Sequence, residues 1–564
     1  VSVPLAFYLN VSSAKVRKAA AYSLGQTGDS SAIAHIVKAL EIEDSVFVRK
    51  ELLESLGKVI TQQDLRKLLY WPLKTQEDKE GLAWGLYRAG IRNVHDGISV
   101  DMALSMLDAS NNYMTRLGAA HFLSRTRNLN LKDRNAMIIR AANSDVSENV
   151  RMACTLALRN SKHRTSQDAL VALSKDTDYR VRVNALRALS VYEVPDIITT
   201  LMNCLNDSNH HVPITSADLL TRKATKDQQS SIEQAVEKAT YLRVKSTLYG
   251  TLLRIADNKQ PVIDDIRAAY DTATNDYYKA NLLTALGSSV LAQEYVVTKT
   301  FSEKSLVVRT AGIGALANIR RNENFPEELE EAFADIFKQA IETKDIAMIA
   351  SSASVITTPE FDFKSYYESA QFLTIVRDQL QLPKDIEAIQ MLDRAIAFFN
   401  NDDYQVPKNS YNHPIDWQLV RGLGDNPTAK ITTDKGVITL KLFPEDAPGS
   451  VANFVALSRQ GYYNAKNFHR VVANFVIQGG CNRGDGYGGE DYSIRSEFAN
   501  LKYQEGSVGM ASAGKDTEGT QWFITNSPTP HLDGNYTIFA QVTDGLEVVH
   551  AMEVGDQITS IFIP

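Results

Sequence analysis

The sequence predicts a multidomain chain of α and β parts, an N-terminal α-helical solenoid followed by a C-terminal closed β-barrel. Its 564 residues exceed what one hydrophobic core organises. Small and apolar residues recur with helical spacing up to about residue 400, and from Thr428 onward the period changes to two. We therefore expect a repeat domain over residues 1–400, a linker over 401–426 and a β domain over 427–564.

The composition narrows the class of protein. The chain is 44% hydrophobic and 23% charged, which is ordinary for a globular protein, and it contains no apolar run long enough to cross a bilayer. A net charge of -7 provides no broad basic surface for phosphates. The three cysteines are far apart and lack metal-site spacing. We expect no nucleic-acid partner, no membrane span and no cofactor or metal.

The first part of the chain contains an internal repeat. A "VR" pair followed by small apolar residues recurs at intervals of 30 to 37 residues when weaker copies are included, with clear copies at Arg17, Arg49, Arg151, Arg182 and Arg309. This pattern resembles the HEAT-like repeat family, whose units stack pairs of antiparallel helices. The valine is expected to pack between layers and the arginine to bridge neighbouring turns. Such solenoids expose a curved surface, so the resemblance implies a protein partner or client on it.

Proline, glycine and asparagine interrupt the helical pattern over 401–426, and we expect Trp417 and Leu419 to tie this linker to one domain. The β domain then begins with "KITTDKGVITLKLF", which predicts a hairpin turning at "TDKG". "PGSVANFVALSRQG" predicts a helix with Ser450 as its N-cap and Gly461 as its stop. Short strands with glycines between them follow, as in a barrel.

Two stretches carry a chemical signature. "NFHRVVANFVIQGG" (467–480) and "SVGMASAGKDTEGTQWFITNSPTPHLDGNYTIFAQV" (507–542) contain FHR, F-x-x-Q-G-G, G-x-x-Q-x-F and L-D-G in order. Together they closely resemble the cyclophilin family of peptidyl-prolyl cis-trans isomerases over about 427–564. The resemblance implies a closed barrel with two capping helices, isomerisation of X-Pro bonds, and proline-containing protein or peptide clients.

The resemblance also implies roles for particular residues. Arg470 matches the catalytic arginine, and Gln478 is placed with it as a catalytic residue that also holds the peptide. The remaining matches are substrate-binding positions. The walls of the proline pocket match Phe475, Val476, Phe523 and Leu532. The groove that holds the peptide backbone matches Ala511, Ser512, Ala513 and Gln521, and the rim of the pocket matches His531 and Tyr536.

Four positions depart from the commonest family pattern. Val476 stands for a methionine, Ser512 for an asparagine, Tyr536 for a histidine and His531 for a tryptophan. The last change argues against tight cyclosporin binding. "ANF" (473–475) replaces a Pro-Gly-Phe turn, so the Phe475 loop is expected to shift.

The residue types suit the reaction independently of the resemblance. Rotation about an X-Pro bond breaks amide resonance but cuts no bond, so it needs no nucleophile. The twisted proline nitrogen regains its lone pair, and a guanidinium that stays charged can donate a hydrogen bond to it. A dry apolar pocket would disfavour the planar, charge-separated amide. Arg470 and the apolar residues around it predict this chemistry.

Other readings of the sequence remain. The protein could be a scaffold that binds proline segments without turnover, whereas a hydrolase or metalloenzyme lacks an assembled set of groups. "GDGYGG" (484–489) fits a nucleotide-binding pattern by letter, but no helix is predicted after it, so we expect a mobile loop beside the groove. Because the sequence starts at Val1 without a leader, we expect a removed export signal and favour a bacterial cell envelope or periplasm over the cytoplasm.

Overall fold

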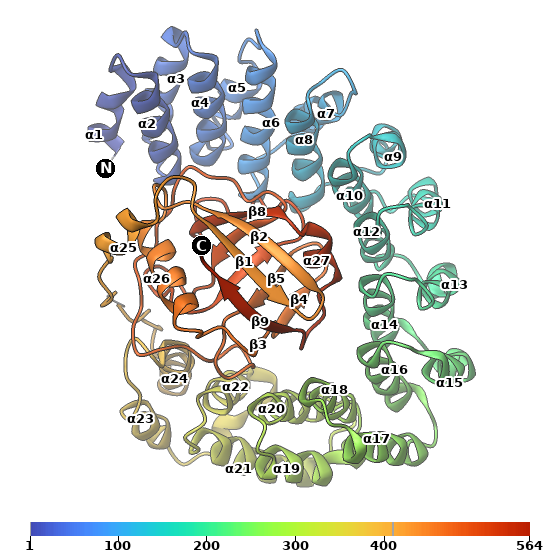
Figure 1. Ribbon diagram of the computed structural model, residues 1–564. Coiled ribbons are helices and arrows are strands. Elements are labelled where there is room, and N and C mark those ends of the chain that lie inside the picture. The colour runs from blue at the N-terminus through green and yellow to red at the C-terminus, as the bar shows by residue number, and fades with distance from the viewer. Residues whose placement is uncertain (1, 409–410) are drawn as a thin grey trace. The chain divides into compact units, whose positions relative to one another are not determined.

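The computed structural model describes residues 2–408 and 411–564. The chain forms two compact units, Val1–Leu219 and Leu220–Pro564. The first consists of helices, whereas the second contains further helices together with the β domain (Figure 1). The proposed boundaries at 1–400, 401–426 and 427–564 remain predictions, and residues 1, 409 and 410 lie outside the described part.

Helices follow one another along the first unit with short connections between them, as the repeat predicts. Their N-termini are frequently capped by side chains: Thr75 and Asp96 each form a capping box, and Asn112 accepts from the backbone N–H of Thr115 at 2.8 Å. The helices are α1 (Ser2–Phe7), α2 (Ala14–Gln26), α3 (Ala32–Ile42), α4 (Val46–Val59), α5 (Leu65–Leu69), α6 (Gln76–Ile91), α7 (Gly97–Met106), α8 (Tyr113–Arg125), α9 (Asn135–Ser144), α10 (Glu148–Ala157), α11 (Arg164–Leu173), α12 (Tyr179–Leu189), α13 (Val194–Cys204) and α14 (His211–Lys223), within which the division falls.

The repeated arginine is structural in this unit. Arg182 forms a two-pronged ion pair with Asp207, at 2.7 and 2.8 Å, and also donates to the carbonyl of Asp176 in the loop before its own helix. One side chain thus ties its own repeat to the next, as expected of the "VR" pair. The same arrangement joins three further pairs, Arg17–Glu43, Arg116–Asp145 and Arg151–Asp176. Arg49 forms a single bond of 2.9 Å to Asp78.

Helix pairs continue into the second unit. Gly287 shows how closely they pack, because a Cβ there would lie 2.9 Å from the backbone of Ala315 on the next repeat. The helices are α15 (Gln229–Lys238), α16 (Leu242–Ile255), α17 (Gln260–Thr272), α18 (Asp276–Leu286), α19 (Gln293–Ser302), α20 (Leu306–Arg320), α21 (Glu330–Ile341), α22 (Ile346–Ile356), α23 (Gln371–Arg377) and α24 (Ile386–Asn400). None of the helices in the described part combines the length and apolar character needed to cross a membrane.

The β domain is one antiparallel sheet of nine strands in the order β3-β9-β1-β2-β8-β6-β7-β5-β4. Its edge strands β3 and β4 are joined by only Phe468 and His469, so the sheet must curl back on itself (Figure 1). The strands are β1 (Thr428–Thr433), β2 (Gly436–Leu442), β3 (Lys466–Asn467), β4 (Arg470–Val472), β5 (Val476–Gly479), β6 (Ser507–Met510), β7 (Trp522–Thr525), β8 (Ile538–Asp544) and β9 (Gln557–Phe562). The predicted fold class is confirmed.

Two helices cap this sheet, as the resemblance implies: α26 (Pro448–Arg459) and α27 (Leu546–Ala551). The expected hairpin is present as β1 and β2, with Thr433 opposite Gly436. Helix α26 ends before Gly461, which takes the left-handed φ of 69° as predicted. Its predicted N-cap is wrong, because Ser450 lies inside the helix. The carboxylate of Glu497 instead accepts from the backbone N–H groups of Gly449 and Ser450, both at 2.9 Å.

The segment before the barrel is held against it. A short helix, α25 (Trp417–Gly422), is capped by Asp416, whose carboxylate accepts from the N–H of Leu419 at 2.9 Å. Leu419 packs on the barrel core, as expected, whereas Trp417 is 51% exposed and contributes little to that contact. His413 stacks on Tyr492 with ring centroids 4.3 Å apart.

Candidate active site

Three neighbouring strands align the central residues of the candidate site. In the β4–β5 pairing, Arg470 lies directly opposite Gln478, and in the β5–β7 pairing Gln478 lies opposite Phe523. Residues directly opposite each other in antiparallel strands project to the same face. The register therefore brings together a cation, an amide and an aromatic ring that are separated by up to 53 positions in the sequence.

The Arg470 guanidinium is available for a ligand. Its Nη1 donates to Oε1 of Gln478 at 3.2 Å, and its Cζ lies 5.4 Å from the ring centroid of Phe475. Throughout residues 2–408 and 411–564, no carboxylate forms an ion pair with it. Burial lowers the pKa of Arg470, and the electrostatic interaction with Tyr536 raises it by a smaller amount. A guanidinium nevertheless stays charged at working pH, so the site holds an uncompensated cation.

An apolar cluster lies beside this cation. Val476, Phe523 and Leu532 are 1%, 5% and 7% exposed and belong to one cluster, against which Phe475 and Tyr536 pack. The cluster also contains Tyr503 and Ile538, which the sequence reasoning did not single out. Tyr503 lies outside the two quoted stretches, and Ile538 lies within the second stretch but outside its motifs. The predicted proline-pocket residues are therefore adjacent in space.

The glutamine side chains form a hydrogen-bonded chain. Gln478 accepts from Arg470 and donates from its Nε2 to Oε1 of Gln521 at 3.1 Å. Gln521 in turn donates to the carbonyls of Gly486 and Gly488, both at 2.8 Å. Each amide is thereby oriented by its neighbour. The Arg470 environment is thus linked to the backbone of the 484–489 loop.

Backbone segments complete the groove. The predicted peptide-holding residues Ala511, Ser512 and Ala513 are all half-buried and follow β6 directly. The N–H of Ala511 donates to the carbonyl of Gln521 at 3.0 Å. Gln478 and the three residues 511–513 also line one cavity, described below. They can therefore contact the same bound peptide.

The predicted rim residues contact the pocket aromatics. His531 stacks on Phe475 with centroids 5.4 Å apart and an interplanar angle of 25°, and Tyr536 meets Phe523 edge-on at 6.1 Å. Asn474 occupies the position of the missing glycine and has the left-handed φ of 56°. Asparagine tolerates this region better than most residues, so the turn forms without glycine. The expected shift of this loop stays a prediction.

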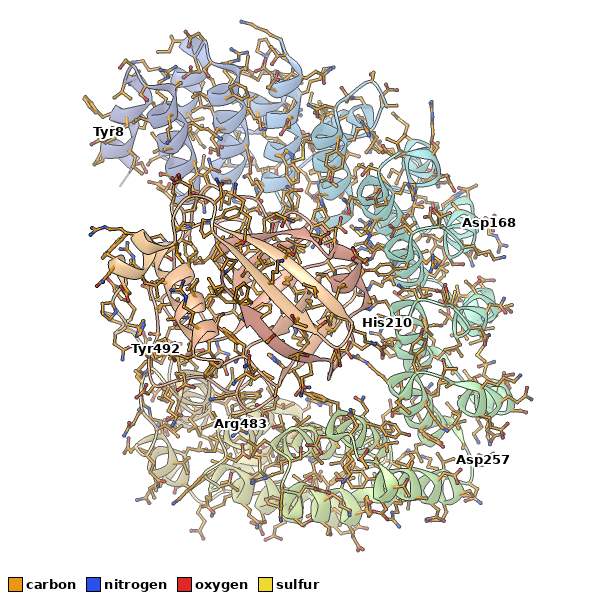
Figure 2. All side chains as sticks on the ribbon, viewed as in Figure 1. Tyr8, Asp168, His210, Asp257, Arg483 and Tyr492 are labelled. Carbon is orange, nitrogen blue, oxygen red and sulfur yellow. The ribbon has the colours of Figure 1, made fainter. Side chains whose placement is uncertain are left out.

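The 484–489 loop lies beside the groove, but helices of the same unit hold it. Arg483, just before it and labelled in Figure 2, is 2.7 Å from Asp345, which immediately precedes α22, and 2.8 Å from Asp485. Thr310 on α20 donates to Asp485 at 3.0 Å, and Tyr277 on α18 donates to the carbonyl of Gly484 at 2.9 Å. The expectation of a mobile loop did not foresee these contacts, because their partners lie more than 130 residues away.

His469 directly precedes Arg470 in the chain, and His210 and His211 are neighbours in the first unit. Burial lowers the pKa of His469 to about 4, so this ring beside Arg470 is neutral at physiological pH. Within the described residues, no group of three or more histidine, cysteine, aspartate or glutamate side chains is arranged to hold a metal ion. His210 and His211 do lie close, with centroids 3.9 Å apart, and belong to no such group.

The fold is a curled antiparallel barrel. At its candidate site, an arginine that forms no ion pair within the described residues lies beside an apolar cluster. Comparison with known proteins identifies the class. Residues 428–560 match the family of cyclophilin-type peptidyl-prolyl cis-trans isomerases, and residues 3–86 and 135–221 match HEAT repeats.

Curated relatives support this match. A peptidyl-prolyl cis-trans isomerase of Helicobacter pylori is 49% identical over 137 residues, covering 24% of this chain and 85% of the relative. Peptidyl-prolyl cis-trans isomerase B of Bacillus subtilis is 47% identical over 125 residues, covering 22% of this chain and 87% of the relative. A solved cyclophilin-type isomerase of Cryptosporidium parvum is 34% identical with a TM-score of 0.24, covering 25% of this chain and 98% of that chain.

The chain belongs to the cyclophilin-type peptidyl-prolyl cis-trans isomerase family, and it carries its isomerase domain behind HEAT repeats.

Proposed function

We propose that Arg470 is the catalytic residue of this isomerase and that the chain accelerates rotation of X-Pro bonds in proline-containing protein clients. The observation that carries this assignment is the free guanidinium, held by Gln478 at 3.2 Å beside the Val476, Phe523 and Leu532 pocket. No covalent chemistry is required of the protein. The task is to bind the twisted amide more tightly than the planar one.

The geometry supports a proposed role for each of these residues. The apolar pocket holds the proline ring and excludes water, which otherwise stabilises the planar amide. Arg470 donates to the proline nitrogen when its lone pair is restored in the twisted state. Gln478 keeps the guanidinium in place and has a neutral amide that can contact the substrate backbone. Ala511, Ser512, Ala513 and Gln521 border the same groove, and His531 and Tyr536 limit its rim.

The HEAT repeats are proposed to hold a client or an assembly partner near the barrel. A tethered client would raise the local concentration of proline segments at the groove. The biological setting proposed for this activity is protein folding in a bacterium. Equal acceleration of a folding protein client by chains with and without an intact solenoid surface would argue against the tethering role.

The catalytic assignment is tested by exchange NMR on a short Ala-Pro-Phe peptide. Arg470→Ala should lower kcat/KM by about 100- to 1000-fold, since one preorganised donor contributes about 3 to 4 kcal/mol to a transition state. Arg495→Ala is the matched control, because Arg495 is an exposed arginine of the same domain. Peptide binding by the intact protein without acceleration would instead favour a non-catalytic scaffold.

A further inference from the structure

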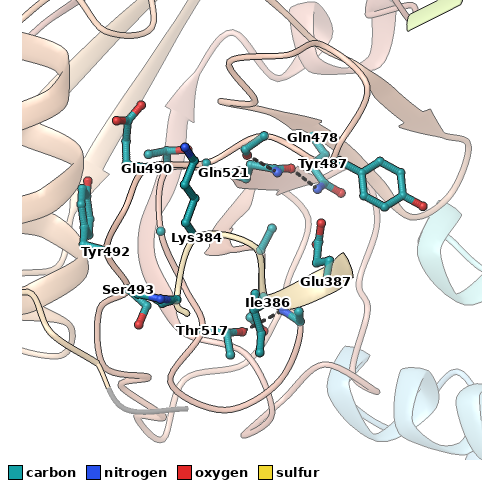
Figure 3. A pocket seen from close by; sticks show the side chains of 18 residues that line it. Lys384, Ile386, Glu387, Gln478, Tyr487, Glu490, Tyr492, Ser493, Thr517 and Gln521 are labelled. Carbon is teal, nitrogen blue, oxygen red and sulfur yellow. Dashed lines mark hydrogen bonds between the residues drawn. The ribbon is translucent and has the colours of Figure 1, made fainter. Parts of the chain in front are cut away.

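A cavity of about 120 Å³ lies beside the candidate active site, and the repeat region forms one of its walls. The barrel side is lined by Gln478, Gln521 and Glu490, among others. The other side is lined by Lys384, in the loop before α24, and by Glu387, in the first turn of α24. Figure 3 shows Glu387 directed from that helix toward Gln478. The cavity has room for roughly four water molecules, which suits one side chain.

The wall formed by α24 is anchored to the groove itself. Gln390 donates from its Nε2 to the carbonyl of Ala513 at 3.2 Å. Glu387 and Gln390 are three residues apart, so they lie on the same face of the helix. The contact that docks this face also directs Glu387 at the cavity. A residue far from the barrel in sequence is thus positioned against its peptide-binding groove.

The Glu387 carboxylate lacks a compensating partner. In the described parts of the chain it forms neither a hydrogen bond nor an ion pair, and Glu387 itself is half-buried. Burial, followed by the nearby charge of Asp485, raises the pKa of Glu387 to about 7. Asp485 is itself satisfied by Arg483. A half-buried carboxylate has lost part of its hydration and gains by meeting a counter-charge, so this one is suited to receive a cation from outside the chain.

At a pH above the pKa of Glu387, where its carboxyl is ionised, the charged groups facing the cavity sum to a negative site. Lys384 approaches from the loop before α24 but forms no ion pair with Glu387, and Glu490 contributes a second carboxylate from the barrel loop. The remaining lining groups nearest the groove are the neutral amides of Gln478 and Gln521. A positive side chain placed here would be attracted, whereas a negative one would meet like charge.

We propose that Glu387 is a specificity-determining residue, and that this cavity receives a lysine or arginine side chain of the client close to the target proline. The inference rests on the proposed function, because it requires the client backbone to lie along Gln478 and Ala511–Ala513. It adds that the repeat region contributes directly to the substrate site. The client class is therefore a basic segment that contains proline.

The test uses the full chain and exchange NMR on peptides that carry lysine, norleucine or glutamate at each of the three positions before proline and the one after it. Norleucine matches the lysine stem without its charge. At one position, kcat/KM should be about 5- to 10-fold higher for lysine than for norleucine, equivalent to about 1 kcal/mol. Glu387→Gln should bring this ratio close to 1, and Glu387→Lys should favour the glutamate peptide.

Glu360→Gln is the matched control, because Glu360 is an exposed glutamate of the same unit and lies outside the cavity. It should keep the wild-type ratio. The wild-type preference should also weaken with added salt, a readout that needs no variant. A lysine-to-norleucine ratio near 1 at every position, or one unchanged in Glu387→Gln, overturns the inference. Absence of turnover on every peptide would instead refute the proposed function.

Discussion

Two arginines of the barrel, Arg470 and Arg483, differ in what surrounds them. Arg470 has an amide and an aromatic ring as neighbours, whereas Arg483 contacts two carboxylates, those of Asp345 and Asp485. A compensated guanidinium holds elements together, and an uncompensated one retains its hydrogen-bonding capacity for a ligand. The partner of each charge, rather than the residue type, separates the structural arginine from the candidate catalytic one.

The repeat region extends this comparison. Arg182 and Asp207 form an ion pair between two repeats within the first unit. In the second unit, Arg309 lies 3.4 Å from Asp345, and the same carboxylate also receives Arg483. Asp345, the acid that pairs with the repeat arginine, is therefore shared with an arginine of the barrel. One recurring pattern thus serves both stacking and docking.

The largest expected effect concerns a buried carboxyl without a cation. Glu518 is fully buried, and Thr537 donates to it at 2.9 Å. Burial raises its pKa to about 8, above its value of 4.5 in an unfolded chain. Its stabilising contribution is therefore complete below about pH 4.5 and is lost as the pH rises toward 8.

Glu518→Gln cannot ionise, so the unfolding free energy of this variant should depend less on pH over the same window. The difference from wild type should be on the order of 3 to 5 kcal/mol between pH 4.5 and 8. Urea unfolding of both proteins at several pH values measures it. Parallel pH profiles for the two proteins would show that the carboxyl is ionised in the folded state.

Removing the docking arginine should have the next largest effect. Arg483→Ala leaves Asp345 and Asp485, which are 4% and 1% exposed at their side chains, without their shared cation. We expect a loss of about 2 to 3 kcal/mol in the unfolding free energy, because a buried charge remains uncompensated. Thermal and urea unfolding measure the loss, with Arg495→Ala as the exposed control. A stability equal to that of the control would mean that the loop docks without this ion pair.

A smaller change tests the docking contact alone. Tyr277→Phe removes one hydroxyl, which donates to the carbonyl of Gly484 at 2.9 Å, and leaves the ring that packs on Gly555. The expected cost is about 1 kcal/mol, the usual net contribution of one hydrogen bond. Amide hydrogen exchange at residues 484–489 should become faster while that of β5 stays unchanged. Equal rates in both proteins would exclude a role for this hydroxyl in holding the loop.

Features whose causes lie within a short stretch of chain could be predicted from the amino-acid sequence. The β1–β2 turn, the stop of α26 at Gly461 and the alternation of the strands depend on neighbouring residues, so local patterns predict them. The motifs around Arg470 and Phe523 also identified the residues that the strand register brings together, since their spacing reflects that register. The roles of these residues stay predictions until they are tested.

Features that depend on distant partners became visible only in the folded chain. Glu497, not Ser450, satisfies the start of α26, and the 484–489 loop is held by helices more than 130 residues away. Glu387 has no sequence motif, and only the docking of α24 directs it at the groove. The physical reason is that hydrogen bonds and charge compensation depend on distance in space. When two groups are far apart in the chain, no local sequence pattern predicts their contact.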